Sequence, residues 1–162
     1  MCGPTPSQTI GPFFGFAMPF TDDAHAVAPS DPGAVRVDGV VVDGAGAPVP
    51  DALVELWADG QFARRRTDPE GAFNVVVRKP DGSAGTPHLE VFVFARGLLW
   101  HLWTRLYFPD EAPANAADAL LGRVEEERRS TLIAVEEGGV LRFDIRLQGE
   151  GETVFFELPE GA

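Results

Sequence analysis

The chain reads G-V-V-V-D-G-A-G-A-P-V-P-D-A-L-V-E-L-W-A at residues 39–58, two apolar runs with a glycine- and proline-rich segment between them. The β-branched run that ends at Val42 and the alternating run from Ala52 to Trp57 are each typical of a short strand. Asp43-Gly44 and the segment 48–51 are turn signals, because glycine and proline favour backbone angles that strands do not use. This stretch therefore predicts two successive strands of an all-β domain.

The same alternation recurs along most of the chain, with turn residues at short intervals. It predicts strands over residues 35–42, 52–57, 62–67, 73–78, 88–95, 99–108, 131–135, 140–147 and 153–157. Only the alanine- and leucine-rich segment 112–124 favours a helix, which Pro113 allows to begin at or after that residue. Many short strands with few helices predict an antiparallel β-sandwich of the prealbumin or transthyretin type with one short helix. We expect an extended N-terminal docking arm over 1–20, a linker over 21–34 and the sandwich over 35–162.

The arm is predicted from T-P-S-Q-T-I-G-P-F-F at residues 5–14. Its two prolines fix the backbone and remove two donors, so neither a helix nor a central strand runs through it. Gly11 lets the backbone approach another surface closely, and the aromatic residues Phe13, Phe14 and Phe16 follow. Two interpretations fit this pattern: a tail packed onto its own core, or an arm that completes a site or interface on a partner.

Composition excludes several classes of function. A length of 162 residues suits one domain, and the net charge of −12 argues against nucleic acids and anionic membranes, despite the short basic run 64–66. No apolar run reaches the roughly 18 residues of a membrane span. The single cysteine, Cys2, and the lack of a signal-peptide pattern predict a cytoplasmic protein without disulfides.

Few residues can carry chemistry. No glycine-rich phosphate loop or nucleophile elbow is present. His88 and Glu90 lie two positions apart on a predicted strand and so share a face. They fit two ligands of a non-haem metal, a His–Glu pair in a polar pocket, or a solvent-facing strand edge. His101 is expected to pack among its neighbours Trp100, Leu102 and Trp103.

Several segments together resemble one known family. These are the arm and the segments G-V-V-V-D-G-A-G-A-P-V-P-D-A-L-V-E-L-W-A (39–58), P-H-L-E-V-F-V-F-A-R-G (87–97), T-R-L-Y-F-P-D-E-A-P-A-N (104–115) and R-F-D-I-R-L-Q-G-E-G-E-T-V-F-F (142–156). Over essentially its whole length the chain resembles the intradiol ring-cleaving dioxygenases, and among them the α subunits of enzymes built from α and β subunits. The resemblance implies a β-sandwich and cleavage of protocatechuate by O2 to 3-carboxy-cis,cis-muconate, with Fe(III) held by the β subunit.

The resemblance also implies that this chain holds no metal. In the family two tyrosinates and two histidines bind the iron, whereas this chain has one tyrosine, Tyr107, at a position that is not a ligand. His88 matches the first histidine, Glu90 replaces the second, and Arg105 stands where catalytic subunits have glutamine. The segments after Ala58 and Lys79 are short for the family. We interpret 88, 90 and 105 as vestigial metal-site positions and expect an ion pair between Glu90 and Arg105.

The family's α subunit contributes to the β subunit's substrate pocket in trans. The matching residues here are Thr9, Gly11 and Pro12 on the arm and Arg96 in F-A-R-G. The glycine and proline would form a rigid wall beside a flat ring, Thr9 a hydrogen bond, and Arg96 a positive charge for a carboxylate. An interface salt bridge is an alternative for Arg96, and Phe13 stands where the family usually has tyrosine. Two other functions remain open: a non-enzymatic prealbumin-like binding module and a self-sufficient intradiol dioxygenase.

Overall fold

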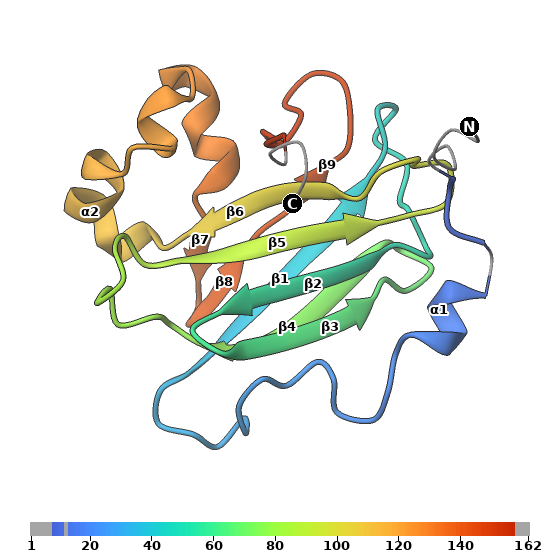
Figure 1. Ribbon diagram of the computed structural model, residues 1–162, viewed down its shortest axis with the longest axis horizontal. Coiled ribbons are helices and arrows are strands. Elements are labelled where there is room, and N and C mark those ends of the chain that lie inside the picture. The colour runs from blue at the N-terminus through green and yellow to red at the C-terminus, as the bar shows by residue number, and fades with distance from the viewer. Residues whose placement is uncertain (1–7, 12, 158–162) are drawn as a thin grey trace, which may run out of the picture.

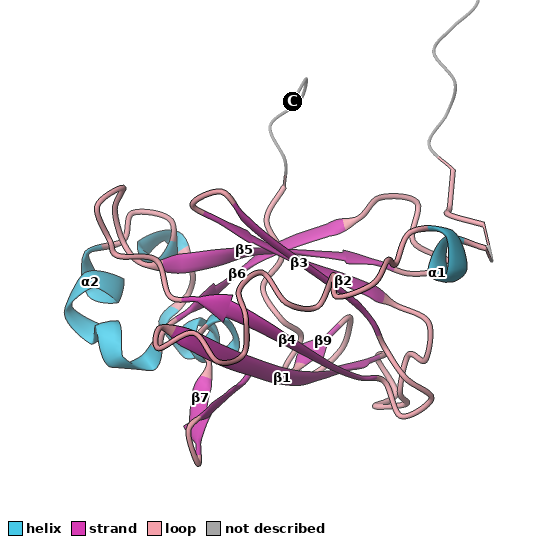
Figure 2. Ribbon diagram, turned by 90° about the horizontal axis from the view of Figure 1, so that it is seen from below, coloured by secondary structure: helices cyan, strands magenta, loops and turns pink. Residues whose placement is uncertain are grey.

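The structure, a computed structural model, describes residues 8–11 and 13–157. Two sheets face each other, with strand orders β4-β1-β8-β7 and β3-β2-β5-β6, and β9 pairs with β1 (Figures 1 and 2). The strands are β1 Ala34–Val42, β2 Leu53–Ala58, β3 Gln61–Arg66, β4 Ala72–Arg78, β5 His88–Phe94, β6 Leu102–Tyr107, β7 Val135–Glu137, β8 Val140–Arg142 and β9 Ile145–Arg146. The predicted all-β sandwich is confirmed. One detail differs, since β8 and β9 pair parallel with β1 and make that sheet mixed.

Alternation along the strands places one face of each sheet in the core. On β5, Leu89, Val91 and Val93 are buried between the sheets, while the other face of this strand is only half-buried. Gly39 on β1 allows close packing, because a Cβ there would lie 2.0 Å from the Phe143 carbonyl oxygen. Because side chains alternate along β5, the outer face of the sheet β3-β2-β5-β6 carries polar and aromatic side chains.

The strands of the C-terminal third differ from the sequence prediction in three places. The segment 140–147 forms two short strands, β8 and β9, instead of one. Residues 131–135 do not form one strand: the 3-10 helix η3 (Glu126–Leu132) precedes β7. Residues 153–157 form an isolated bridge between Trp103 and Phe156 in place of a strand. The hydroxyl of Thr131 donates to the Arg128 carbonyl and accepts from the Val154 amide. Such local side-chain bonds compete with a strand ladder.

The predicted helix over 112–124 is shorter and interrupted. Helix α2 covers Ala112–Ala117, between the 3-10 helices η1 (Pro109–Glu111) and η2 (Leu121–Arg123). Asp118 ends α2 in an extended conformation, and its carboxylate accepts hydrogen bonds from the amides of Leu120 and Leu121. This capping starts a new turn instead of continuing the old one. These helices cover one end of the sandwich (Figure 1).

The N-terminal segment also differs from a uniformly extended arm. A four-residue helix, α1 (Phe14–Ala17), lies at the end of the sandwich away from α2 (Figure 1). Residues 21–34 run along the side of the sandwich, where the Asp23 carbonyl accepts from Arg64 of β3 and the Ala24 carbonyl accepts from Val76 of β4. This segment therefore covers an edge strand of each sheet. The division into arm, linker and sandwich stays a prediction.

Residues 99–101 do not belong to the strand predicted over 99–108. Leu99 and Trp100 are exposed, and β6 begins only at Leu102. The ring of His101 lies between those of Phe92 and Phe94, at centroid distances of 5.5 and 5.3 Å. His101 thus packs against two aromatic side chains of the neighbouring strand. Its expected packing among Trp100, Leu102 and Trp103 stays a prediction.

Candidate functional site

Glu90 is the centre of a polar cluster on the outer face of the sheet β3-β2-β5-β6. Its carboxylate lies 3.0 Å from Nε2 of His88 on the same strand and 2.8 Å from the Arg105 guanidinium on β6. The indole N–H of Trp103 donates to the other carboxylate oxygen at 2.5 Å. The register of β5 and β6 pairs Glu90 directly with Arg105 and therefore creates this cluster. The expected ion pair is present.

Electrostatics keep the Glu90 carboxylate ionised. Partial burial opposes its charge, but hydrogen bonds from His88, Trp103 and Arg105 outweigh that effect and hold the pKa of Glu90 below its ordinary value. Burial also opposes the charge of Arg105, but bonds to Tyr107 and Glu90 raise the pKa of Arg105 above its ordinary value. The cluster thus holds a charged pair within a half-buried layer.

The single tyrosine lies beside this cluster as a neutral phenol. Tyr107 is fully buried, and its hydroxyl donates to the Asp118 carboxylate at 3.0 Å. Burial raises the pKa of Tyr107 to about 12, and the charge of Asp118 contributes further in the same direction. The ring packs with Leu121, Val124 and Leu132 in a second apolar cluster beneath the helices. Tyr107 therefore ties the sheet to the helical layer.

The cluster is poorly suited to a metal ion. Both ring nitrogens of His88 face oxygen atoms, since Nδ1 lies 2.7 Å from the Thr86 carbonyl oxygen and Nε2 faces Glu90. The Arg105 cation contacts the same carboxylate oxygen as His88, and Trp103 donates to the other oxygen. Within residues 8–11 and 13–157, no group of three or more His, Cys, Asp or Glu side chains is arranged to hold a metal.

The turn between β2 and β3 lies beside the Glu90 cluster. Asp59 and Gly60 both have positive φ, 45° and 74°, and join Ala58 to Gln61 in a two-residue hairpin. Such a turn matches the strand twist and leaves no loop to carry further side chains over the sheet. A small hollow of about 200 Å³ remains between Trp57, Glu90 and the loop 80–87.

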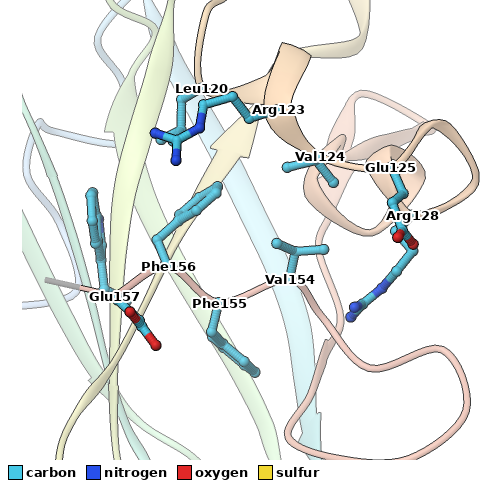
Figure 3. A pocket seen from close by; sticks show the side chains of 10 residues that line it. Leu120, Arg123, Val124, Glu125, Arg128, Val154, Phe155, Phe156 and Glu157 are labelled. Atoms are coloured by element: carbon cyan, nitrogen blue, oxygen red, sulfur yellow. The ribbon is translucent and has the colours of Figure 1, made fainter.

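Trp103 also lines a larger hollow of about 830 Å³, which is shown in Figure 3. Phe155 and Phe156 line it from the C-terminal segment, and Arg123, Val124 and Arg128 line it from the helical segment. Arg128 also donates to the Glu152 carbonyl at 3.0 Å. The sequence did not predict this hollow.

The arm and the F-A-R-G motif meet at the opposite end of β5. The hydroxyl of Thr9 accepts a hydrogen bond of 2.9 Å from the amide of Gly97, next to Arg96. The Arg96 guanidinium is exposed and forms an ion pair with Asp51. Gly11 is exposed as well, and Pro12 lies outside the described residues. Thr9 and Arg96 are thus brought to one corner, beyond the Phe94 end of β5.

Sequence reasoning missed three partners in these two regions. Trp103 was interpreted as packing and Asp118 as part of a helix, whereas they hold Glu90 and Tyr107. Asp51 was interpreted as a turn residue, although it pairs with Arg96. The register of β5 and β6 would have revealed Trp103, because alternate residues of paired strands share a face. Nothing in the sequence pattern indicates the other two pairings.

Two curated relatives match the chain over almost its full length. Both are named protocatechuate 3,4-dioxygenase alpha chain; the one from Burkholderia cepacia is 38% identical over 95% of this chain and 97% of its own. The one from Pseudomonas putida is 38% identical over 94% of this chain and 96% of its own. No family model matches the chain.

Solved structures of ring-cleaving dioxygenases share the fold. The dioxygenase domain of a carbohydrate-binding fusion protein from Streptomyces sp. SirexAA-E superimposes with a TM-score of 0.61, at 28% identity over 91% of this chain and 99% of that one. Hydroxyquinol 1,2-dioxygenase from Pseudomonas putida DLL-E4 gives a TM-score of 0.60, at 21% identity over 88% of this chain and 65% of that one. The second likeness concerns the fold alone.

Proposed function

This chain belongs to the protocatechuate 3,4-dioxygenase alpha chains, and we propose that it is the subunit that binds no metal and completes the substrate pocket of an Fe(III)-bearing β subunit. As an alpha chain it works within a hetero-oligomeric oxidoreductase, a ring-cleaving dioxygenase. The reaction proposed for the complex is intradiol cleavage of protocatechuate by O2 to 3-carboxy-cis,cis-muconate.

The Glu90 cluster is the observation that carries the proposal. Intradiol dioxygenases are non-haem iron(III) enzymes, and Fe(III) is a hard cation that favours anionic oxygen ligands. Here the carboxylate is already neutralised by Arg105, and both nitrogens of His88 are engaged. The one phenol is buried and its pKa is raised to about 12. These side chains do not fit a ferric ion, so we assign the iron to the partner.

The corner formed by Thr9 and Arg96 supports a contribution in trans. The exposed guanidinium offers a positive charge outside the core of its own subunit. A dianionic catecholate that carries a carboxylate is an acidic ligand, which such a charge would favour. We propose that Thr9, Gly11, Pro12 and Arg96 border the partner's substrate pocket, with no catalytic residue in this chain.

Co-expression with the candidate partner tests this function. The partner is a homologous chain that carries two tyrosine and two histidine ligands. We expect stoichiometric iron and oxygen uptake on protocatechuate only in the purified complex, measured by metal analysis and an oxygen electrode. A solitary chain that holds stoichiometric iron and cleaves the ring would overturn the proposal. A complex that forms but gains neither iron nor activity would do the same.

A further inference from the structure

We propose that two alternate arginines of β3, Arg64 and Arg66, form a clasp that fixes the path of residues 13–20 on their own subunit before the partner docks. The role of the clasp in docking rests on the proposed function, whereas the contacts that form the clasp lie within this chain alone. Both side chains project from the outer face of the sheet β3-β2-β5-β6, toward the N-terminal segment. Arg65, between them, points to the other face and is exposed.

Arg66 holds helix α1. Its guanidinium lies over the ring of Phe16, 5.0 Å from the centroid. Gly15 is buried against the same side chain, and a Cβ on this glycine would lie 2.9 Å from Nε of Arg66. This nitrogen is buried without a hydrogen-bond partner. Among the described residues the Arg66 side chain has no carboxylate partner either, and its described contacts are with Gly15 and Phe16. Stacking on an aromatic ring is a contact that the planar guanidinium makes well.

Arg64 holds the residues that follow α1. Its Nη1 donates to the Met18 carbonyl at 2.8 Å, and its Nη2 and Nε donate to the Glu55 carboxylate at 2.6 and 2.8 Å. Glu55 is buried and also accepts from the indole of Trp57. The backbone amide of Arg64 donates to the Asp23 carbonyl, and the Asp23 carboxylate accepts from the Phe20 amide. The ion pair thus orients the guanidinium that binds the arm.

The clasp leaves the apolar side chains of the arm facing outward. Phe13 and Phe16 are 76% and 72% exposed, and Met18 and Phe20 are exposed as well. An arm already ordered on its own subunit loses less conformational entropy when a partner covers these side chains. The occupant to which we assign this surface is the β subunit, because the arm runs on to the Thr9–Gly97 corner proposed to border its pocket.

Hydrogen exchange of the α1 amides tests the clasp directly. The amides of Phe16, Ala17 and Met18 donate to carbonyls of Phe13 and Phe14 and are protected only while α1 is formed. We expect Arg66→Ala to speed their exchange roughly two- to fivefold in the full chain. Arg65→Ala removes the same side chain from the same strand and is the matched control. The core amide of Thr67 is expected to be unaffected by either change.

Each outcome separates the clasp from the proposed function. Faster exchange for Arg66→Ala alone supports the clasp, and equal rates for the two variants overturn it. Arg66→Lys is expected to restore part of the protection, because a cation over the ring remains. In the complex with the β subunit, Arg66→Ala is expected to raise KM for protocatechuate and to leave kcat nearly unchanged. Faster exchange with unchanged KM would keep the clasp and contradict the arm's role in trans.

Discussion

The guanidinium of Arg105 lies 2.8 Å from the carboxylate of Glu90, directly across the pair of strands β5 and β6. Trp103 donates to the second oxygen of the same carboxylate. An ion pair therefore stands at two of the positions that the resemblance predicts to be vestigial metal-site positions. The Arg105 cation neutralises the Glu90 carboxylate, and loss of this pair is expected to lower the free energy of unfolding.

Glu90→Gln is expected to lower the free energy of unfolding by about 1–3 kcal/mol at neutral pH, because it leaves Arg105 without its carboxylate and turns an amide group toward a donor. The pKa of Glu90 is lowered in the folded state. Its contribution is therefore complete above the ordinary glutamate pKa of about 4.3 and is lost as the pH falls through the folded-state value. Urea unfolding across this range measures the difference between wild type and variant.

The matched control for this experiment is Glu136→Gln, which alters an exposed carboxylate on β7. It is expected to change stability by less than about 0.5 kcal/mol. A Glu90→Gln effect that does not shrink toward acid pH would contradict the assignment of the ionised pair. An equal effect from both variants would contradict it too.

Tyr107 is the only tyrosine of the chain, so an ultraviolet phenolate titration reports on it alone. We expect a midpoint near 12, since burial raises the pKa of Tyr107 to about that value. The neutral phenol is favoured in the folded state. Its contribution to stability is therefore complete below the unfolded-state pKa of about 10 and is lost as the pH rises toward 12. Tyr107→Phe is expected to remove this alkaline dependence and to lower stability by about 0.5–1.5 kcal/mol.

A titration midpoint close to 10 would contradict both the burial of the phenol and its interaction with Asp118. The amide of Leu120 donates to the same carboxylate. The complementary test is Asp118→Asn. It keeps the size of the side chain and removes its charge. We expect it to lower the midpoint of Tyr107 toward 10, because the negative charge that contributes to the raised pKa is gone.

Strict alternation made β5 predictable within a residue, since Leu89, Val91 and Val93 face a core that accepts only apolar side chains. The segment 131–135 was not predictable in this way. Residues 132–135 are all apolar, as in a buried strand, but the Thr131 hydroxyl donates to the Arg128 carbonyl and holds a 3-10 turn. Asp118 likewise ends a helix that composition alone would have continued.

For the candidate site, the family resemblance identified the positions of Glu90 and Arg105, and the register of β5 and β6 explains their contact. The pairing of Asp51 with Arg96 and the bond from Gly97 to Thr9 join segments far apart in the chain. Such contacts depend on how loops fold back over the sandwich, which hydrophobic periodicity does not encode.

Arg96→Ala is expected to weaken substrate binding by the complex with the β subunit about 10- to 100-fold, equivalent to roughly 1.5–3 kcal/mol. The expected reason is loss of a positive charge for the substrate carboxylate. Steady-state kinetics on protocatechuate measure this as a rise in KM. Unchanged KM and kcat would reject the role of Arg96.

Asp51→Asn separates the two interpretations of Arg96, because it removes the ion pair but keeps the guanidinium. If the arginine serves the substrate, we expect this variant to change KM by no more than a few-fold. If the ion pair matters only for the interface, Asp51→Asn and Arg96→Ala are expected to weaken assembly of the subunits equally, as measured by sedimentation. Arg96→Lys keeps the charge without the planar group and is expected to fall between wild type and alanine.

Removal of residues 1–12 is expected to abolish most of the activity of the complex and to leave the sandwich folded. The described part of this stretch, residues 8–11, contributes the bond from Gly97 to Thr9 and a weak one from Phe14 to Gly11. Helix α1 and its contacts with Arg66 remain in the shortened chain. Thermal unfolding of the isolated chain is expected to stay within a few degrees of wild type, since one exposed hydrogen bond is worth about 0.5–1.5 kcal/mol. Full oxygen uptake by a complex with the shortened chain would contradict a role of the arm in the pocket, and Thr9→Ser, which keeps the hydroxyl, is the control expected to retain activity.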